Sequence, residues 1–176
     1  MIKVIAFDLV GVLVREKDIE LNEIESKIER LFGPNISDLE YFEKARLIFS
    51  GDIISITKDL VNKLYEVKDK NLINKIKKNF PNIKIVIATN HVSFIRDFIE
   101  KELIVDDIII SAEINMIKPN SNFYNYLLDK YKIEASELLF LDDNIENIDG
   151  AYKLGINTIK VDKNTNIYEE ILHKIK

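Results

Sequence analysis

Five short runs of β-branched and apolar residues constrain the fold of this chain more than any other feature. Each run is continuous rather than alternating, which is typical of strands buried on both faces of a sheet. The runs cover residues 3–7, 83–88, 107–110, 138–141 and 157–161. From the second run onward they alternate with segments of helical periodicity, at 94–103, 122–131, 145–154 and 167–175. This alternation predicts a parallel, Rossmann-like sheet in a three-layer α/β sandwich.

The segment between the first two runs has a different pattern and predicts an inserted helical unit. Its apolar residues follow helical spacing over 19–32, 36–50, 53–65 and 71–80. The turn signals between these helices are Gly33-Pro34-Asn35 and Ser50-Gly51-Asp52. Ser37 and Asp52 are expected to be helix N-caps. We therefore predict a core domain of residues 1–14 and 81–176, with residues 15–80 forming a small all-α cap subdomain.

Composition limits the partners and metals that such a chain can bind. Thirty acidic and 25 basic residues give a formal net charge of −5, which argues against a nucleic-acid partner. The chain has no cysteine and only two histidines, so we expect any metal to be bound by oxygen atoms. No apolar run of about 18 residues is present, and the first residues lack signal-peptide character. We expect a cytoplasmic protein that binds a small molecule and no membrane.

Polar residues stand where three of the predicted strands end. Asp8 follows the first strand, Thr89 and Asn90 follow the second, and Asp142 and Asp143 follow the fourth. Ligands of open parallel sheets bind beyond the carboxyl ends of the strands. Adjacent carboxylates repel each other unless a cation or a proton lies between them. Each residue alone could be a helix cap or a surface residue, but together they predict a cation-binding site.

The order of these residues resembles the four motifs of the haloacid dehalogenase-like hydrolase superfamily. The matching segments are Phe7-Asp8-Leu9-Val10-Gly11-Val12-Leu13, the strand end at Thr89, Lys118-Pro119, and Leu141-Asp142-Asp143-Asn144. The helical insertion resembles the small cap of the phosphatase branch. The resemblance implies a Mg²⁺-dependent hydrolase that acts on small phosphorylated metabolites.

Physical reasoning agrees with the roles that the resemblance implies. An aspartate beside a divalent cation can attack phosphorus, because the cation offsets the repulsion between two anions. Asp8 is the expected nucleophile, and Lys118 is expected to neutralise charge on Asp8 and the phosphoryl oxygens. The expected Mg²⁺ ligands are Asp8, Val10 through its main-chain carbonyl, Asp142 and Asp143. The expected substrate contacts are Thr89, Asn90 and Lys118, with Thr89 and Lys118 also acting in catalysis.

Val10 is the one departure from the phosphatase pattern. Phosphatases of this superfamily place there an aspartate that protonates the leaving alcohol and later deprotonates the attacking water. General acid/base catalysis contributes about 10²–10⁴ in rate, or roughly 3–5 kcal/mol. We therefore predict reduced or atypical phosphatase activity. His91, two residues after Thr89, is a candidate substitute proton relay, although a loop histidine is more often exposed.

Two other interpretations stay open. The chain could be a non-catalytic module that binds a phosphorylated ligand, because Val10 cannot move a proton. It could also be a dehalogenase-type or phosphonatase-type enzyme, since both of these branches lack the same aspartate. Phosphonatase chemistry would need a desolvated cap lysine such as Lys58 or Lys63.

Overall fold

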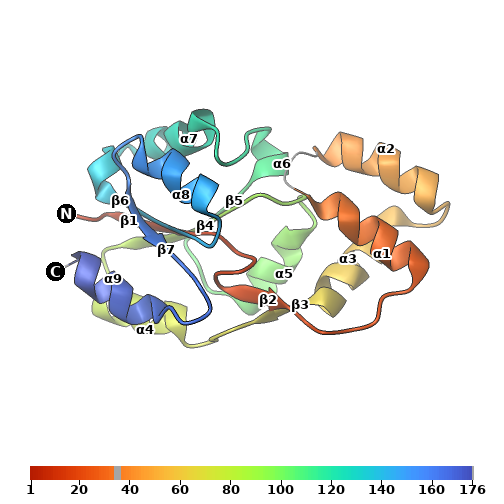
Figure 1. The fold of residues 1–176 in the computed structure, drawn as a ribbon, viewed down its shortest axis with the longest axis horizontal. Helices are drawn as coiled ribbons and strands as arrows, with labels where there is room; N and C mark the ends of the chain where they lie inside the picture. The colour runs from red at the N-terminus through yellow and green to blue at the C-terminus, as the bar shows by residue number, and fades with distance from the viewer. Residues whose placement is uncertain (34–36, 176) are drawn as a thin grey trace.

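The computed structural model describes residues 1–33 and 37–175, which are built around a five-stranded parallel sheet (Figure 1). In spatial order the strands are β5 (Asp107–Ile110), β4 (Lys84–Thr89), β1 (Val4–Phe7), β6 (Leu138–Asp142) and β7 (Asn157–Lys160). Phe7 of β1 lies level with Ile87 of β4 on one side and Leu141 of β6 on the other. Asp8 follows Phe7, so this register brings it beside the carboxyl ends of both neighbouring strands. The predicted α/β fold is confirmed.

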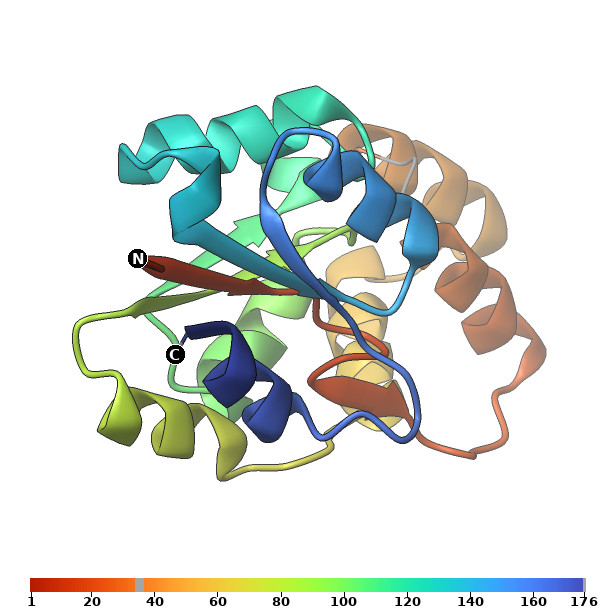
Figure 2. The ribbon, with the colours of Figure 1, turned by 60° about the vertical axis from the view of Figure 1, so that its left-hand side comes forward.

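Helices cover both faces of the sheet and complete the three layers (Figure 2). One face carries α4 (Leu72–Asn79), α5 (Ile95–Glu102) and α9 (Ile167–Ile175), and the other carries α7 (Ser121–Tyr131) and α8 (Ile145–Tyr152). Successive side chains of a strand point to opposite faces. In β1, Ile5 and Phe7 therefore pack into the first layer, and Val4 and Ala6 pack into the second. Burial on both faces explains why the strands are continuous apolar runs.

Of the helices between β1 and β4, those that precede α4 lie to one side of the sheet (Figure 1). They are α1 (Glu23–Glu29), which continues into the 3₁₀ turn η1 (Arg30–Phe32), α2 (Asp38–Ile48) and α3 (Ile53–Leu64). Ser37 accepts a hydrogen bond from the Glu40 N–H and Asp52 accepts from the Ile54 N–H, which confirms both predicted N-caps. The predicted turn at Pro34-Asn35 and the helix start at residue 36 lie outside the described residues.

The expectation that the insertion contains helices alone is wrong at its start and between α3 and α4. The strands β2 (Val14–Glu16) and β3 (Tyr65–Val67) form an antiparallel pair at the base of α1–α3. Strands of three residues are too short to show a period-two pattern, so periodicity could not predict them. The short helix α6 (Ser111–Ile114) and the turn η2 (Ala135–Glu137) were not predicted either. Helix α4 packs beside α9, where the Lys75 ammonium lies 5.9 Å from the centre of the Tyr168 ring (Figures 1 and 2).

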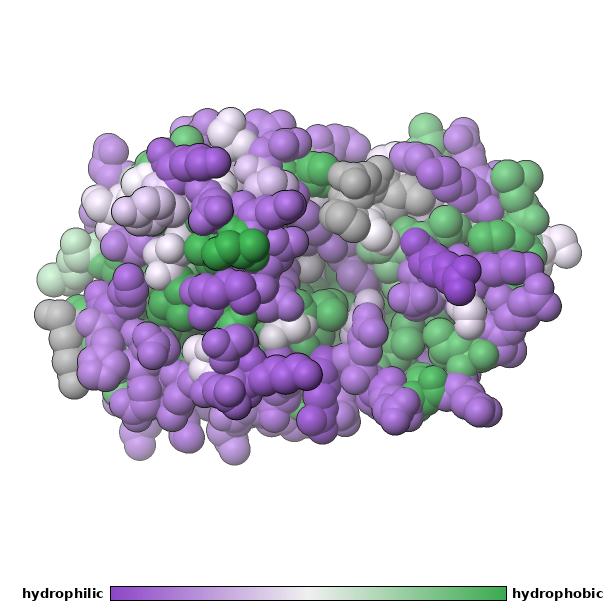
Figure 3. Space-filling view, viewed as in Figure 1, coloured by the Kyte–Doolittle hydropathy of each residue, from purple (hydrophilic) through white to green (hydrophobic). Residues whose placement is uncertain are grey.

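The molecular surface is largely hydrophilic on the side shown in Figure 3, with hydrophobic side chains between the polar ones over α1–α3. The large exposed hydrophobic residues of these helices are Ile24, Leu39, Leu47 and Ile54. None of the helices in the described part of the chain has the length and apolar character needed to cross a bilayer.

Candidate active site

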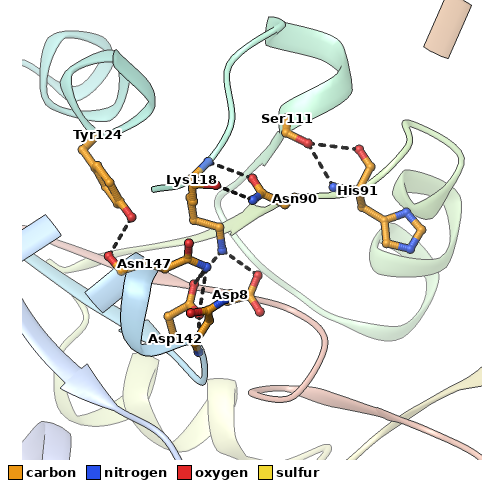
Figure 4. A network of polar contacts seen from close by, with 9 residues as sticks. Asp8, Asn90, His91, Ser111, Lys118, Tyr124, Asp142 and Asn147 are labelled. Atoms are coloured by element: carbon orange, nitrogen blue, oxygen red, sulfur yellow. Dashed lines mark hydrogen bonds and ion pairs between the residues drawn. The ribbon is translucent and has the colours of Figure 1, made fainter. Parts of the chain in front are cut away.

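Lys118 connects two carboxylates at the carboxyl edge of the sheet (Figure 4). Its Nζ donates to Asp8 Oδ1 and to Asp142 Oδ2, at 2.7 Å in each case. The side chains of Lys118 and Asp142 are fully buried, and that of Asp8 is 11% exposed. Charge-assisted hydrogen bonds in such a poorly solvated place are strong, because little water screens them. The ends of β1 and β6 and the loop before α7 thus meet at a single ammonium group.

The charges at this edge favour a divalent cation. Burial raises the pKa of Asp8, Lys118 opposes that rise, and Asp142 adds to it. Burial also disfavours the charge on Lys118, but the two aspartates outweigh it and raise its pKa. One oxygen from each of Asp8, Asp142 and Asp143 lies within 4.8 Å of the others. Three carboxylates with one ammonium leave negative charge uncompensated, and an all-oxygen donor set suits Mg²⁺. The residues present therefore fit the expected metal.

The loop after β1 is shaped so that Asp143 can lie against it. The Val14 N–H donates to the Leu9 carbonyl and the Gly11 N–H donates to the Val14 carbonyl, each at 2.9 Å. Gly11 has a φ of +90°, and a Cβ on this residue would collide with the Asp143 carboxylate. Glycine is therefore needed here for both conformation and space. Val10, in the same turn, is half-buried against the core and carries no group that could transfer a proton.

Asn147 holds Asp142 in place and was not predicted. Its Nδ2 donates to both carboxylate oxygens of Asp142, at 3.1 and 3.0 Å, and the Asn144 N–H donates to Oδ1 at 2.8 Å. The Tyr124 hydroxyl of α7 donates to the Asn147 carbonyl at 2.7 Å (Figure 4). The available sequence signal was an amide in the first turn of the helix after the acidic pair.

Asn90 binds the main chain of Lys118 in both directions. Its Nδ2 donates to the Lys118 carbonyl at 2.9 Å, and the Lys118 N–H donates to its Oδ1 at 3.0 Å. The amide therefore fixes the main chain from which the lysine side chain extends. Thr89, just before it, is buried at the end of β4. The contacts of Asn90 and Thr89 with a substrate stay predictions.

His91 is buried and its ring points away from the carboxylates (Figure 4). Its Nδ1 lies 3.1 Å from the Val92 carbonyl, which can only accept, so this nitrogen carries the proton. Nε2 then accepts from the Tyr65 hydroxyl at 3.1 Å. The ring also lies 5.2 Å from that of Phe32, measured between centroids. Burial lowers the pKa of His91 to about 4. The expectation of an exposed histidine is wrong, because the helical insertion covers this loop, and both ring nitrogens are engaged away from the carboxylates.

The two cap lysines considered for phosphonatase chemistry are both in exposed ion pairs. Lys58 Nζ lies 2.6 Å from Asp97, and Lys63 Nζ lies 2.8 Å from Glu25. Their side chains are 43% and 41% exposed. Neither occupies the desolvated pocket that a Schiff-base lysine needs.

Fold and site together define an α/β protein with a cluster of three carboxylates and one lysine at the carboxyl edge of a parallel sheet. The haloacid dehalogenase-like hydrolase family matches residues 5–161, and the chain belongs to this family. The match spans all four motifs and confirms the resemblance at the level of the superfamily.

Similar structures and sequences agree with this assignment. A predicted haloacid dehalogenase-like hydrolase from Porphyromonas gingivalis superposes with a TM-score of 0.76 at 20% identity, covering 100% of this chain and 98% of that one. A family enzyme from Bacteroides thetaiotaomicron, in complex with magnesium and inorganic phosphate, gives a TM-score of 0.74 at 16% identity, covering 97% and 99%. At these identities the likeness establishes the fold. Mouse bifunctional epoxide hydrolase 2 is 38% identical over 66 residues, which are 38% of this chain but only 12% of that protein.

Proposed function

We propose that the protein is a Mg²⁺-dependent hydrolase of small phosphorylated metabolites, with Asp8 as nucleophile and with reduced or atypical phosphatase activity. One observation carries this proposal. Lys118 Nζ lies 2.7 Å from both Asp8 and Asp142, with Asp143 beside them. The Bacteroides relative, in complex with magnesium and inorganic phosphate, supports the same cofactor and ligand class.

In the proposed reaction, an Asp8 oxygen attacks phosphorus and the bond from phosphorus to the leaving oxygen breaks. Water then attacks the resulting aspartyl phosphate, the bond from phosphorus to Asp8 breaks, and inorganic phosphate is released. Lys118 holds Asp8 for attack and offsets charge on the phosphoryl oxygens, to which Thr89 donates a hydrogen bond. Bound Mg²⁺ would reduce the repulsion between the two anions, with Asp8, the Val10 carbonyl, Asp142 and Asp143 as its protein ligands.

Val10 makes the proposed activity depend on the leaving group. No acid at this position can protonate the departing alkoxide, which costs about 10²–10⁴ in rate for alkyl phosphates. Aryl or acyl phosphates release a more stable anion and lose less. Activated phosphates are therefore the preferred substrates of the wild-type chain.

The experiment that tests this proposal compares wild type with Val10→Asp, each with Mg²⁺ or with EDTA. The substrates are p-nitrophenyl phosphate and a panel of sugar phosphates and other small organic phosphates. We expect Val10→Asp to raise Mg²⁺-dependent turnover of alkyl phosphates about 10²-fold or more. Asp8→Asn should abolish turnover in both backgrounds. Unchanged activity in Asp8→Asn would show that the proposal is wrong.

Val10 also favours a second candidate, a non-catalytic module that binds a phosphorylated ligand. In that case inorganic phosphate should raise the melting temperature only when Mg²⁺ is present, with no hydrolysis of any substrate in the panel. A dehalogenase-type activity would instead be independent of Mg²⁺, which the EDTA arm detects.

We also propose that residues 15–80 form the cap over this site and that residues 1–14 and 81–176 form the core. The near-complete burial of Asp8, which is 8% exposed, supports a cap that covers the nucleophile. Because α4 packs beside α9 in a layer of the core, the part of this segment proposed to cover the site consists of the helices α1–α3 and the pair of strands β2 and β3. The net charge of −5 supports a small-molecule partner rather than nucleic acid.

A further inference from the structure

We infer that Tyr65 and His91 are positioning residues that couple the cap to Lys118, an inference that rests on the proposed function of Lys118. Neither residue touches the carboxylate cluster. They act through three consecutive contacts, from Tyr65 to His91, from His91 to its neighbour Asn90, and from Asn90 to the main chain of Lys118.

The first contact joins the base of the cap to the loop after β4. The Tyr65 hydroxyl donates to His91 Nε2 at 3.1 Å, and the centroids of the two rings are 5.8 Å apart. Tyr65 is 5% exposed and His91 is 3% exposed, so water does not compete for this bond. Phe32, at the end of the first cap helix, contacts the imidazole as well. Tyr65 and Phe32 of the insertion therefore hold one side of the imidazole, and the Val92 carbonyl of its own loop accepts from Nδ1 on the other.

The second contact is the peptide bond that joins His91 to Asn90, so the position of the His91 side chain can affect Asn90. The His91 N–H donates to Ser111 Oγ at 3.0 Å, and the Ser111 hydroxyl lies 3.3 Å from the His91 carbonyl (Figure 4). The main chain of His91 is thus held by Ser111, the first residue of α6, while the Nε2 side of its ring is held by Tyr65. In the inferred coupling, a shift of the cap pulls on the His91 side chain, weakens the 3.0 Å bond from the His91 N–H to Ser111, and so turns the peptide between Asn90 and His91.

The third contact links the orientation of this peptide to Lys118. Asn90 makes the pair of hydrogen bonds that fixes the Lys118 main chain, at 2.9 and 3.0 Å. Lys118 then spans Asp8 and Asp142 with two bonds of 2.7 Å. A small displacement is enough to weaken charge-assisted bonds of this geometry and to misplace the nucleophile.

The test uses Tyr65→Phe in the whole chain, because this change keeps the aromatic ring and removes only the hydroxyl. The first readout is the hydrogen-exchange rate of the Lys118 main-chain N–H, measured by NMR without substrate. We expect this amide to exchange about tenfold faster than in wild type, because its Asn90 partner is less firmly held. The second readout is the hydrolysis of p-nitrophenyl phosphate with Mg²⁺, for which kcat should fall about tenfold with KM changed less than twofold.

Tyr41→Phe is the matched control. Tyr41 is a buried cap tyrosine whose hydroxyl bonds Thr57 rather than His91, and the change to Phe keeps its ring contact with Phe32. Tyr41→Phe should lose about as much stability as Tyr65→Phe. It should leave both the exchange rate of the Lys118 main-chain N–H and kcat unchanged. A second pair of variants gives a conservative rescue. His91→Gln retains an acceptor for the Tyr65 hydroxyl and should preserve both readouts, whereas His91→Leu should not.

Unchanged protection of the Lys118 amide in Tyr65→Phe would overturn the inference, as would an equal effect of Tyr41→Phe. If the wild type hydrolyses none of the phosphates, the proposed hydrolase function fails, but the exchange of the Lys118 amide still decides whether the coupling exists. The two failures are therefore distinguishable.

Discussion

The side-chain amide of Asn147 donates to both carboxylate oxygens of Asp142, at 3.1 and 3.0 Å. This arrangement predicts that Asn147→Ala weakens Mg²⁺ binding about 10–100-fold, because groups that orient a ligand contribute that much to metal affinity. Isothermal titration of the variant with Mg²⁺ measures the change. Asn157→Ala is the control, since Asn157 donates its amide to the Ser136 carbonyl at the other end of the sheet. Equal Mg²⁺ affinity in both variants would contradict the prediction.

Gly11 and Gly155 provide a matched pair for testing the space beside Asp143. Both have positive φ, at +90° and +82°, so alanine at either position should cost about 1–2 kcal/mol of stability. A Cβ on Gly11 collides with the Asp143 carboxylate, whereas a Cβ on Gly155 meets only the Ala135 methyl group at 3.8 Å. Gly11→Ala alone should therefore weaken Mg²⁺ binding, as measured by titration. Similar Mg²⁺ affinities in the two alanine variants would show that Asp143 does not contribute to the metal site.

Lys118→Met should destabilise the protein strongly, because it leaves two buried carboxylates without their cation. Removing one partner of a buried ion pair typically costs about 3–5 kcal/mol. Urea unfolding measures this loss, and saturating Mg²⁺ should recover part of it because the ion binds the folded carboxylates. Lys130→Met is the control, since Lys130 pairs with Asp107 at the surface and should cost less than about 1 kcal/mol. A loss for Lys118→Met as small as that of the control would argue against a buried charge pair.

His91 predicts a specific dependence of stability on pH. Its pKa is lowered to about 4 in the folded protein, against about 6.5 in the unfolded chain. Between these values the unfolded state binds more protons, so the free energy of unfolding falls as the pH is lowered from about 6.5 to about 4. The total loss is roughly 3 kcal/mol. Urea unfolding gives the free energy of unfolding of wild type and of His91→Gln across this pH range, and the difference isolates the contribution of His91. If the two free energies depend on pH in parallel, the prediction is wrong.

The carboxylates of the site could be predicted because they depend on chain order alone. Asp8 and the pair Asp142 and Asp143 directly follow apolar runs, and in a parallel sheet all carboxyl ends lie at one edge. Their partners could not be predicted in the same way. The substrate contact expected of Asn90 stays a prediction, and the bonds of its amide to the Lys118 main chain were not predicted. Asn147 was not singled out, because its contact with Asp142 depends on how α8 begins.

The sequence by itself determined the five strands of the parallel sheet, the main helices and the strand-end carboxylates, since each follows from local periodicity or from the position of a residue after a strand. Only the tertiary structure decided that His91 is buried under Tyr65, that α4 lies beside α9, and that β2 pairs with β3. Those features arise from contacts between segments far apart in the chain. Burial and hydrogen bonding at such positions depend on packing, which the local pattern does not encode.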